Sequence, residues 1–347
     1  MYDFDILQYV KHFPPEALTN INTDASGDEC SINTECRLLR QCPEIIRKFR
    51  FIRNVPYCKI GANAVYVCCP VPPQPYVPPK DNDKRIVREC KSYQNTRKVC
   101  DKSLIVGGKN ADPKEFPFMA LLFYVNGDQR TVLCGGSLVS DKYVVTAAHC
   151  FYVPNEPNIV RLGELDYNKS DDDAAPVDFS IATYKIHDEY DDDIRFHDIA
   201  VVKLNASVQF NDYILPACLP LADGRDFKQF LATGWGALKD YGRSASHLQK
   251  VKLDNFNDEL CLSKVDKAAI TINTTIQMCA GSFYYERDTC AGDSGGPLFV
   301  DHPDYNCLFL VLGVTSYGEG GCANKGLPSF YTRLSVYVDW IEKIVWG

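Results

Sequence analysis

Sixteen cysteines in a chain of 347 residues constrain the fold of this protein more than any other feature of its sequence. Their number is even, and six of them crowd into residues 30–69. No pair has the C-x-x-C spacing of a zinc ribbon or a redox dithiol, and the six histidines are scattered rather than grouped as metal ligands. The sequence therefore predicts that the sixteen cysteines form eight disulfides in a protein secreted to the extracellular space.

Charge and composition fit that compartment and exclude several classes of function. The formal net charge of −8 argues against binding to nucleic acid or to an anionic membrane surface. No apolar run approaches the roughly 20 residues that span a bilayer. Three glycosylation sequons begin at Asn168, Asn205 and Asn273. The first residues lack the pattern of a signal peptide, so we expect that either the upstream segment is absent from this chain or the gene model is incomplete.

The sequence divides into four segments. Residues 1–29 are polar and are expected to form a poorly ordered leader. Residues 30–69 have the cysteine spacing C-x5-C-x5-C-x15-C-x9-C-C, and about forty residues cannot bury a sufficient core without disulfides. Within this module we expect a helix at residues 37–51 and a short strand at 64–68. Residues 70–104 begin with a Pro-rich spacer and continue as a highly charged linker.

Residues 105–347 have the pattern of an all-β domain. Short β-rich runs lie at residues 119–124, 136–139, 144–147, 199–204 and 308–315, and clusters of Gly, Pro, Asn and Asp separate them. This alternation predicts a barrel or a sandwich. Residues 336–345 have helical spacing, which predicts a helix at the end of the chain.

Three short segments of this region carry groups that can act in catalysis. His149 lies beside Cys150 and, taken alone, would be a packed core histidine. Asp198 stands at the head of an apolar strand, where a solvated carboxylate is common. Ser294 lies within Gly292-Asp-Ser-Gly-Gly-Pro297, a tight turn that exposes the hydroxyl and can point N–H groups at a bound oxyanion. The three together, in the order His, Asp, Ser, are hard to explain as structural residues.

Residues 105–347 resemble the trypsin/chymotrypsin family of serine proteases. Six ordered motifs carry the resemblance: Ile105-Val-Gly-Gly108, Thr146-Ala-Ala-His-Cys150, Asp198-Ile-Ala, Gly234-Trp-Gly236, Gly292-Asp-Ser-Gly-Gly-Pro297 and Ser316-Tyr-Gly318. The resemblance implies two six-stranded antiparallel β-barrels closed by a C-terminal helix. It also implies Ser294 as nucleophile, His149 as general base and Asp198 as the residue that orients the imidazole. The N–H groups of Gly292 and Ser294 would form the oxyanion hole, and no catalytic metal or organic cofactor is required.

The N-terminal cysteine module resembles the clip domain of arthropod serine proteases, through the spacing that ends in Cys68-Cys69 before Pro70. By that resemblance the module contains the pairs Cys30–Cys68, Cys36–Cys58 and Cys42–Cys69, although spacing alone leaves many connectivities open. The protease resemblance implies the pairs Cys134–Cys150, Cys261–Cys279 and Cys290–Cys322. Four cysteines remain: we expect Cys218 and Cys307 each to bind one of the linker residues Cys90 and Cys100, and the sequence leaves open which.

The motif that starts at Ile105 lies within the chain, so the chain as written resembles a zymogen. In the family, cleavage before Ile105 frees an α-ammonium group that pairs with the residue at Asp293. The residue before the scissile bond is Leu104, where most relatives have Arg or Lys, and it suits an activating protease with an apolar pocket. Leu104 and Cys307 resemble subgroup C of the clip proteases, which includes the Snake-like and Persephone-like enzymes.

The primary specificity pocket is expected around Asp288, six residues before Ser294. In this family a carboxylate at that position favours Arg or Lys substrates through a charge-assisted hydrogen bond. Ser316 and Gly318 are expected to bind substrate, and Gly318 leaves one wall of the pocket open. Ser329 stands where a glycine is usual, and we expect it to narrow the pocket and to change the choice between Arg and Lys.

Calcium is the one cofactor that the resemblance suggests. Relatives bind the ion with loop carboxylates and carbonyls, and Glu164 occupies the position of such a ligand. The loop over residues 164–178 is longer here, so the acidic residues 171–173 also fit a solvated loop tip.

These expectations combine into one function. We expect a serine endopeptidase zymogen of the haemolymph that cuts after Arg or Lys and activates another zymogen in an immune or developmental cascade, such as Toll signalling or melanisation. Its expected partners are an upstream activating protease with apolar specificity, the downstream zymogen and serpin inhibitors. A digestive trypsin is the first alternative, and the clip module argues against it. A non-catalytic clip-domain cofactor is the second, and the intact Ser294 motif argues against it.

Overall fold

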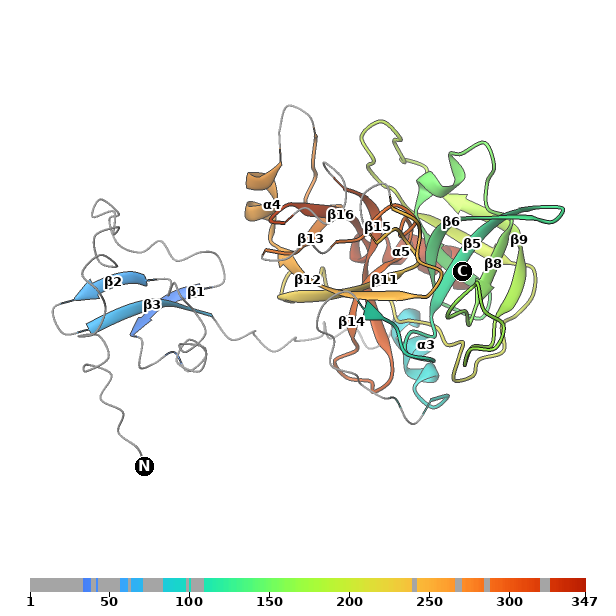
Figure 1. Cartoon of the computed structure of the whole chain (residues 1–347), viewed down its shortest axis with the longest axis horizontal. Coiled ribbons are helices and arrows are strands. Elements are labelled where there is room, and N and C mark those ends of the chain that lie inside the picture. Colours follow the sequence, from blue (N-terminus) through green and yellow to red (C-terminus); the bar gives the residue numbers. More distant parts are fainter. Residues whose placement is uncertain are drawn as a thin grey trace. The chain divides into compact units, whose positions relative to one another are not determined.

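The computed structural model contains two compact units, residues Met1–Pro73 and Gln74–Gly347 (Figure 1). It describes residues 34–38, 42, 57–61, 64–70, 84–97, 100, 109–238, 242–265, 270–283, 288–318 and 325–347. Within these residues, none of the helices is both long enough and apolar enough to cross a membrane.

The smaller unit contains a three-stranded antiparallel sheet. Its strands follow the order β1 (Thr34–Leu38), β3 (Ala64–Pro70), β2 (Tyr57–Gly61). A disulfide joins Cys42 to Cys69 of β3, with 5.6 Å between the two Cα atoms. The sheet and this bond hold together a unit that is too small to depend on a hydrophobic core alone.

Two local predictions for this unit have different outcomes. The strand expected at residues 64–68 is confirmed by β3. The helix expected at 37–51 is wrong at its start, because Arg37 and Leu38 belong to β1 and pair with β3. Cys42 is also not helical, and the other residues of that predicted helix, together with the side chains of the expected pairs Cys30–Cys68 and Cys36–Cys58, lie outside the described part of the chain.

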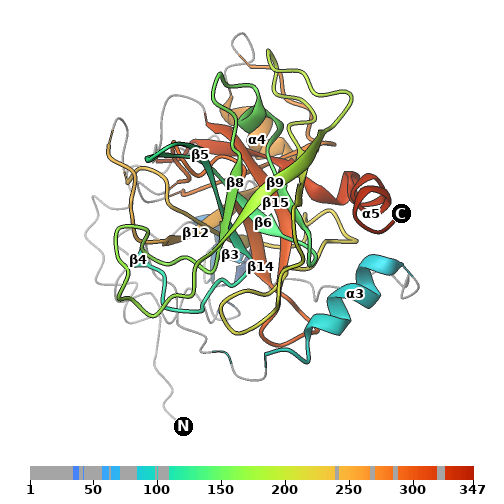
Figure 2. The same ribbon diagram turned by 90° about the vertical axis from the view of Figure 1, so that its right-hand side faces the viewer.

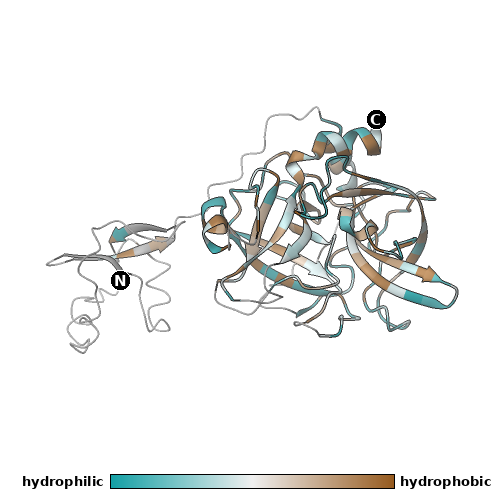
Figure 3. Ribbon diagram, turned by 90° about the horizontal axis from the view of Figure 1, so that it is seen from above, coloured by the Kyte–Doolittle hydropathy of each residue, from teal (hydrophilic) through white to brown (hydrophobic). Residues whose placement is uncertain are grey.

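A closed six-stranded antiparallel barrel forms the first half of the larger unit (Figure 1). Around the barrel the strands are β10 (Ala200–Leu204), β7 (Tyr143–Thr146), β6 (Gln129–Leu138), β5 (Met119–Asn126), β8 (Ile159–Leu162) and β9 (Val177–Ile186). Valine, leucine and aromatic residues dominate these strands, since such side chains suit a pleated and partly buried surface. In Figure 3 hydrophobic and hydrophilic segments alternate along the barrel strands.

The second barrel has the same number of strands and one short addition. Its strands are β11 (Gln229–Gly234), β14 (Pro297–Asp301), β15 (Phe309–Gly318), β16 (Pro328–Arg333), β13 (Gln277–Gly281) and β12 (Gln249–Phe256). Pairing of β11 with β12 closes the circle, and the two-residue strand β4 (Lys109–Asn110) pairs with β12.

Four phenylalanines pack the two barrels together. Phe116 and Phe118 lie just before β5. The centroids of their rings are 5.3 and 5.1 Å from that of Phe299 on β14. Phe309 at the start of β15 completes the cluster, 5.1 Å from Phe118. Most of these pairs are edge-to-face, the arrangement that the charge distribution of aromatic rings favours. The barrels are thereby fixed against each other, and loops from both can contribute to one site.

The last helix closes the larger unit as expected. The 3-10 turn η4 (Leu334–Val336) leads into α5 (Val338–Trp346), whose Val338 and Ile341 are buried. The predicted architecture of two six-stranded antiparallel barrels with a C-terminal helix is therefore confirmed.

The charged linker contains a helix that the sequence pattern did not predict. The helix α3 (Arg85–Tyr93) buries Ile86, Cys90 and Tyr93 and lies beside α5 (Figure 2). Lys84 Nζ is 3.0 Å from Asp339 Oδ1, and the backbone N–H of Arg85 donates to Glu342 Oε1 at 3.0 Å. Because the helix depends on these tertiary contacts, its polar composition alone did not indicate it.

Disulfides tie the linker and the loops to the barrels. Cys90 of α3 bonds to Cys218, and Cys100 bonds to Cys307, which answers the question that the sequence left open. Within the larger unit the pairs Cys134–Cys150 and Cys261–Cys279 are present, and Cys290 is disulfide-bonded while residue 322 lies outside the described residues.

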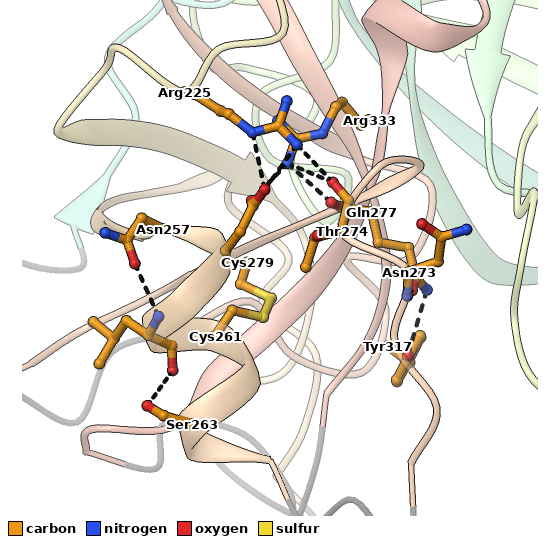
Figure 4. Close-up of a disulfide and its surroundings, with 12 residues drawn as sticks. Arg225, Asn257, Cys261, Ser263, Asn273, Thr274, Gln277, Cys279, Tyr317 and Arg333 are labelled. Atoms are coloured by element: carbon orange, nitrogen blue, oxygen red, sulfur yellow. Dashed lines mark hydrogen bonds and ion pairs between the residues drawn. A yellow bond between two sulfur atoms is a disulfide. The ribbon is translucent and has the colours of Figure 1, made fainter.

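A short helix carries one of these bonds. Figure 4 shows Cys261 of α4 (Asp258–Lys264) bonded to Cys279 of β13. The side chain of Asn257 caps this helix by accepting a hydrogen bond from the N–H of Leu260 at 2.9 Å. Nearby, Arg333 donates to the carbonyl oxygen of Gln277 at 3.0 Å.

Candidate active site

Strand pairing brings His149 and Asp198 together. Ala200 of β10 lies opposite Thr146 of β7 in the register, so the residues that flank these two strands meet at one end of the first barrel. His149 lies on the 3-10 turn η3 (Ala148–Phe151) that follows β7. Its Nδ1 atom is 2.7 Å from Asp198 Oδ2, and its backbone N–H donates to Asp198 Oδ1 at 2.9 Å.

The carboxylate of Asp198 is buried, and both of its oxygen atoms accept hydrogen bonds. Its side chain has no exposed surface, and the hydroxyl of Ser316 on β15 donates a hydrogen bond to Oδ2. Thr332 on β16 donates to its backbone carbonyl oxygen at 2.8 Å. Burial opposes the charged form, but hydrogen bonds from His149 and Ser316 outweigh burial and hold the pKa of Asp198 below its ordinary value.

Ser294 lies in a turn of the second barrel that packs against the first. The carbonyl oxygen of Ser294 accepts a hydrogen bond from the N–H of Gly135 on β6 at 2.8 Å. Its neighbour Gly295 has φ +76°, and a Cβ atom there would lie 2.1 Å from the hydroxyl oxygen of Thr146. A glycine is therefore required, and the close approach places Ser294 beside the segment that leads to His149.

The backbone of this turn leaves two N–H groups without a backbone acceptor. The N–H groups of Asp293, Gly295 and Gly296 each donate to a carbonyl oxygen. Those of Gly292 and Ser294 have no such acceptor in the part of the chain that the structure describes. Because Gly292 has φ +97°, the turn reverses sharply at this point.

Asp293 points away from the turn into the protein. Its Oδ1 atom accepts a hydrogen bond from the N–H of Gly236 and its Oδ2 atom one from the N–H of Cys290, both at 2.8 Å. Burial raises the pKa of Asp293 to about 6, although these two hydrogen bonds lower it. The expected cleavage site at Leu104 and Ile105 lies outside the described residues.

The residues expected in the specificity pocket are close to one another. Gly318 of β15 stands opposite Ser329 of β16 in the register. The hydroxyl of Ser329 donates to Asp288 Oδ2 at 2.7 Å, and the N–H of Thr289 donates to Asp288 Oδ1 at 2.8 Å. Ser316 lies on the same strand as Gly318, and its side chain contacts Asp198, a contact that no sequence signal indicated.

The carboxylate suggested as a calcium ligand pairs with an arginine. Arg161 donates to Glu164 Oε2 at 3.0 Å and binds both carboxylate oxygens of Asp178, at 2.6 and 2.8 Å. The other oxygen of Glu164 accepts from the N–H of Leu165 at 2.9 Å. A guanidinium group therefore supplies positive charge to the carboxylates of Glu164 and Asp178. At the acidic tip of this loop, residues 171–173, Asp173 forms an ion pair with Lys114.

The three glycosylation sequons are accessible. Asn168, Asn205 and Asn273 are all exposed. The side-chain oxygen of Asn273 accepts a hydrogen bond from the N–H of Thr275 at 3.0 Å, and the other two lie in exposed loops.

Comparisons with known proteins identify the family. The family model described as Trypsin matches residues 105–341. Serine protease snk from Drosophila melanogaster is 34% identical over 340 residues, which cover 89% of this chain and 75% of that protein. Proclotting enzyme from Tachypleus tridentatus is 30% identical over 356 residues, covering 95% of this chain and 91% of that protein.

A third relative extends over both units of the chain. The CLIP domain-containing serine protease HP8 from Bombyx mori is 31% identical over 365 residues, covering 93% of this chain and 95% of that protein. The two barrels, the His149–Asp198 contact and the glycine-rich turn around Ser294 agree with these matches. The chain therefore belongs to the trypsin family of serine endopeptidases and, within that family, to the arthropod clip-domain proteases.

Proposed function

We propose that this endopeptidase is a secreted zymogen that is activated by cleavage between Leu104 and Ile105, cuts after Arg or Lys and activates another zymogen in an arthropod protease cascade. The observation that carries the proposal is the contact between His149 and Asp198 beside the turn that holds Ser294. No metal or organic cofactor takes part in the proposed reaction.

In the proposed mechanism, Ser294 Oγ attacks the scissile carbonyl carbon while His149 Nε2 takes the hydroxyl proton. The short contact from His149 Nδ1 to Asp198 Oδ2 supports this assignment, because a proton on Nδ1 leaves the Nε2 lone pair free to act as a base. His149 then gives the proton to the leaving amine, and an acyl-enzyme remains. Water attacks the acyl carbon by the same proton transfers and releases the acid.

The negative charge on the tetrahedral intermediate needs hydrogen-bond donors. We assign these to the N–H groups of Gly292 and Ser294, which have no backbone acceptor within the described residues. Loss of one such donor typically costs about 100- to 1000-fold in kcat.

The proposed specificity depends on Asp288. Its carboxylate would meet the cationic end of an Arg or Lys side chain through a charge-assisted hydrogen bond. A guanidinium group normally contacts both oxygens of a carboxylate. Because Ser329 already donates to Asp288 Oδ2, an Arg substrate must compete with this hydroxyl for one of the two contacts. We therefore propose that Ser329 reduces the preference for Arg over Lys.

The proposed activation depends on Asp293. A buried carboxylate that has only N–H partners among the described residues is costly, and an α-ammonium group from Ile105 would compensate for its charge. Leu104 does not suit a pocket with a carboxylate at its floor, because burial of an unpaired charge against leucine is unfavourable. The activator is therefore proposed to be a different protease with an apolar pocket.

Relatives support a place in a cascade. Proteins named Melanization protease 1, from Drosophila melanogaster, and Phenoloxidase-activating factor 3, from Holotrichia diomphalia, are 36% and 37% identical over 264 and 257 residues. We propose that the clip unit docks onto a partner, that the substrate is a protease zymogen and that serpins inhibit the active enzyme. The disulfides and the exposed sequons support secretion into the haemolymph.

One experiment tests the whole proposal. The purified zymogen is cleaved before Ile105 with an elastase-like protease and incubated with candidate zymogens from haemolymph, and the cut bonds are identified by mass spectrometry. We expect cleavage after Arg or Lys in one candidate, and none with the Ser294→Ala control. Cuts that occur mainly after apolar residues, or equal cutting by the control, would refute the proposal.

A further inference from the structure

A cluster of metal-ligating side chains lies outside the active site. His187, Glu189 and His197 each place one ligand atom within 4.8 Å of the others. Two other groups with this property exist among the described residues, but each contains a cysteine pair. Those pairs, Cys90–Cys218 and Cys134–Cys150, are disulfides, whose sulfur atoms are not thiolate ligands. The cluster around His187 is therefore the one group described here whose ligands are all free to bind a metal ion.

The geometry of the cluster is close to that of an ion site. The imidazole rings of His187 and His197 are stacked nearly parallel, with centroids 5.0 Å apart, so one ring must turn before both nitrogen lone pairs point at the same ion. His197 Nε2 is 3.9 Å from Glu189 Oε2. Tetrahedral zinc places its ligand atoms about 3.3 Å apart, because each bond is about 2.0–2.1 Å long. The Glu189 side chain is 74% exposed and can move this short distance without disturbing packed residues.

Neighbouring residues hold the two histidines in place. Tyr337 Oη is 3.0 Å from His197 Nδ1, so the phenol oxygen can hold a proton on Nδ1 while Nε2 faces the cluster. Histidine ligands of metals commonly have such a partner on the second ring nitrogen. His187 packs against the rings of Tyr337 and Trp340, with centroid distances of 5.2 and 5.1 Å. His197 has φ +56°, a conformation that costs energy and occurs often where a ligand is held.

We propose that His187, Glu189 and His197 form a regulatory binding site for a zinc ion. Two imidazoles and one carboxylate suit zinc, and a water molecule would complete the tetrahedron. Acidic residues of the same loop, among them Asp191 and Asp193, would attract the cation. If His187 binds the ion through Nε2, its Nδ1 atom must carry the ring proton and can no longer accept the 3.3 Å hydrogen bond from the N–H of Glu189. Because this hydrogen bond is lost, we expect reversible rather than permanent binding.

The site is coupled to catalysis through one peptide bond. His197 directly precedes Asp198, whose carboxylate contacts His149 at 2.7 Å. Turning the His197 ring towards the ion shifts the backbone that carries Asp198, and small displacements of catalytic groups reduce rates strongly. Zinc is therefore expected to inhibit peptide hydrolysis without occupying the specificity pocket.

Direct binding tests the site without any need for activity. Zinc chloride is titrated into the Ser294→Ala protein by calorimetry, and Co²⁺ replaces zinc to give the visible absorption of a tetrahedral site. We expect one ion per molecule, with affinity at least about tenfold weaker in Glu189→Gln and in His187→Gln. Asp193→Asn is the matched control, because it removes the same charge from the same loop without removing a ligand, and its affinity should stay within about twofold of the parent protein. Equal affinity in all four proteins would refute the site.

Inhibition tests the coupling. Hydrolysis of an Arg-anilide by the activated enzyme is measured over a range of zinc concentrations, with and without EDTA. The wild type and Asp193→Asn should be inhibited reversibly, and Glu189→Gln should need at least about ten times more zinc for the same fractional inhibition. Inhibition that is unchanged in Glu189→Gln and His187→Gln would place the ion elsewhere, for example on His149, and would overturn the inference.

Discussion

At the scale of single residues, Asp198 fixes the tautomer of the His149 imidazole. It accepts hydrogen bonds from the backbone of His149 and from the hydroxyl of Ser316, and it contacts His149 Nδ1. An ionised carboxylate can only accept hydrogen bonds, so Nδ1 must carry a proton. The imidazole is thereby held in the tautomer whose Nε2 atom can accept a proton, as the proposed mechanism requires.

The first prediction concerns this tautomer. In Asp198→Asn the amide can donate to Nδ1, which favours a proton on Nε2 and removes the base. We expect kcat for an Arg-anilide to fall by about 10⁴-fold with little change in KM. Asp128→Asn, which changes an exposed aspartate, serves as the control. A loss of less than about tenfold would contradict the role assigned to Asp198.

The second prediction concerns the specificity pocket. In Ser329→Gly the Oδ2 atom of Asp288 loses the 2.7 Å hydrogen bond from Ser329 and can accept one from a guanidinium group instead. One charge-assisted hydrogen bond is worth about 1.5–3 kcal/mol, so kcat/KM for Arg substrates should rise about tenfold relative to Lys substrates. Paired Arg and Lys anilides measure this ratio. A ratio that stays the same or moves towards Lys would show that Ser329 does not restrict the pocket.

The residues of the proposed site differ in how visible they are in the sequence. His149, Asp198 and Ser294 could be predicted because each lies in a short motif with a recognisable setting. The contacts of Ser316 and Thr332 with Asp198 could not, because 118 and 134 residues separate the partners and only the packing of the second barrel, which holds β15 and β16, against the first brings them together.

At the scale of elements, the linker shows why composition alone is a weak guide. Ile86, Cys90 and Tyr93 follow helical spacing, yet charged residues surround them and obscure the pattern. The helix is stabilised by contacts with α5 and by the bond from Cys90 to Cys218, neither of which is local. The β-rich runs were predicted more reliably, since their burial follows directly from their apolar residues.

The third prediction concerns the loop for which the family resemblance suggests calcium as one possibility. Arg161→Gln leaves Glu164, whose side chain is 2% exposed, without its cation. Breaking such a pair costs about 3 kcal/mol, so the melting temperature should fall by several degrees. Arg130→Gln is the matched control, because Arg130 touches the same Asp178 from an exposed position and should matter little.

Chelation completes this test. Because Arg161 supplies the positive charge, the melting temperature of the wild type should be the same with EDTA and with added calcium. A rise of several degrees in calcium would show that the ion displaces the guanidinium group.

At the scale of the whole molecule, two disulfides would keep the N-terminal part attached after the proposed cleavage. Cys90 and Cys100 precede the proposed cleavage site, and their partners Cys218 and Cys307 follow it. Cleavage would therefore free the new N-terminus without releasing the clip unit. Such tethering keeps a docking unit and a catalytic unit in one molecule at high effective concentration.

The last prediction concerns the change in stability on activation. In the uncleaved chain the buried Asp293 has a pKa raised to about 6, so above that pH the zymogen carries a buried carboxylate with two N–H partners among the described residues. Pairing with the α-ammonium group of Ile105 lowers this pKa in the activated form. Activation should therefore stabilise the protein above pH 6, and the gain should disappear as the pH falls below 6, because the zymogen carboxylate then takes up a proton.

The gain corresponds to about 1.4 kcal/mol for each unit by which the pKa falls. The melting temperatures of the zymogen and the activated form are measured between pH 4 and pH 7.5, and the difference between the two temperatures is the gap that reports this gain. Asp293→Asn should abolish the pH dependence of the gap, since the amide does not titrate, whereas Asp128→Asn should preserve it. A gap in the wild type that is equally large at pH 4 and pH 7 would mean that Asp293 does not receive the new N-terminus.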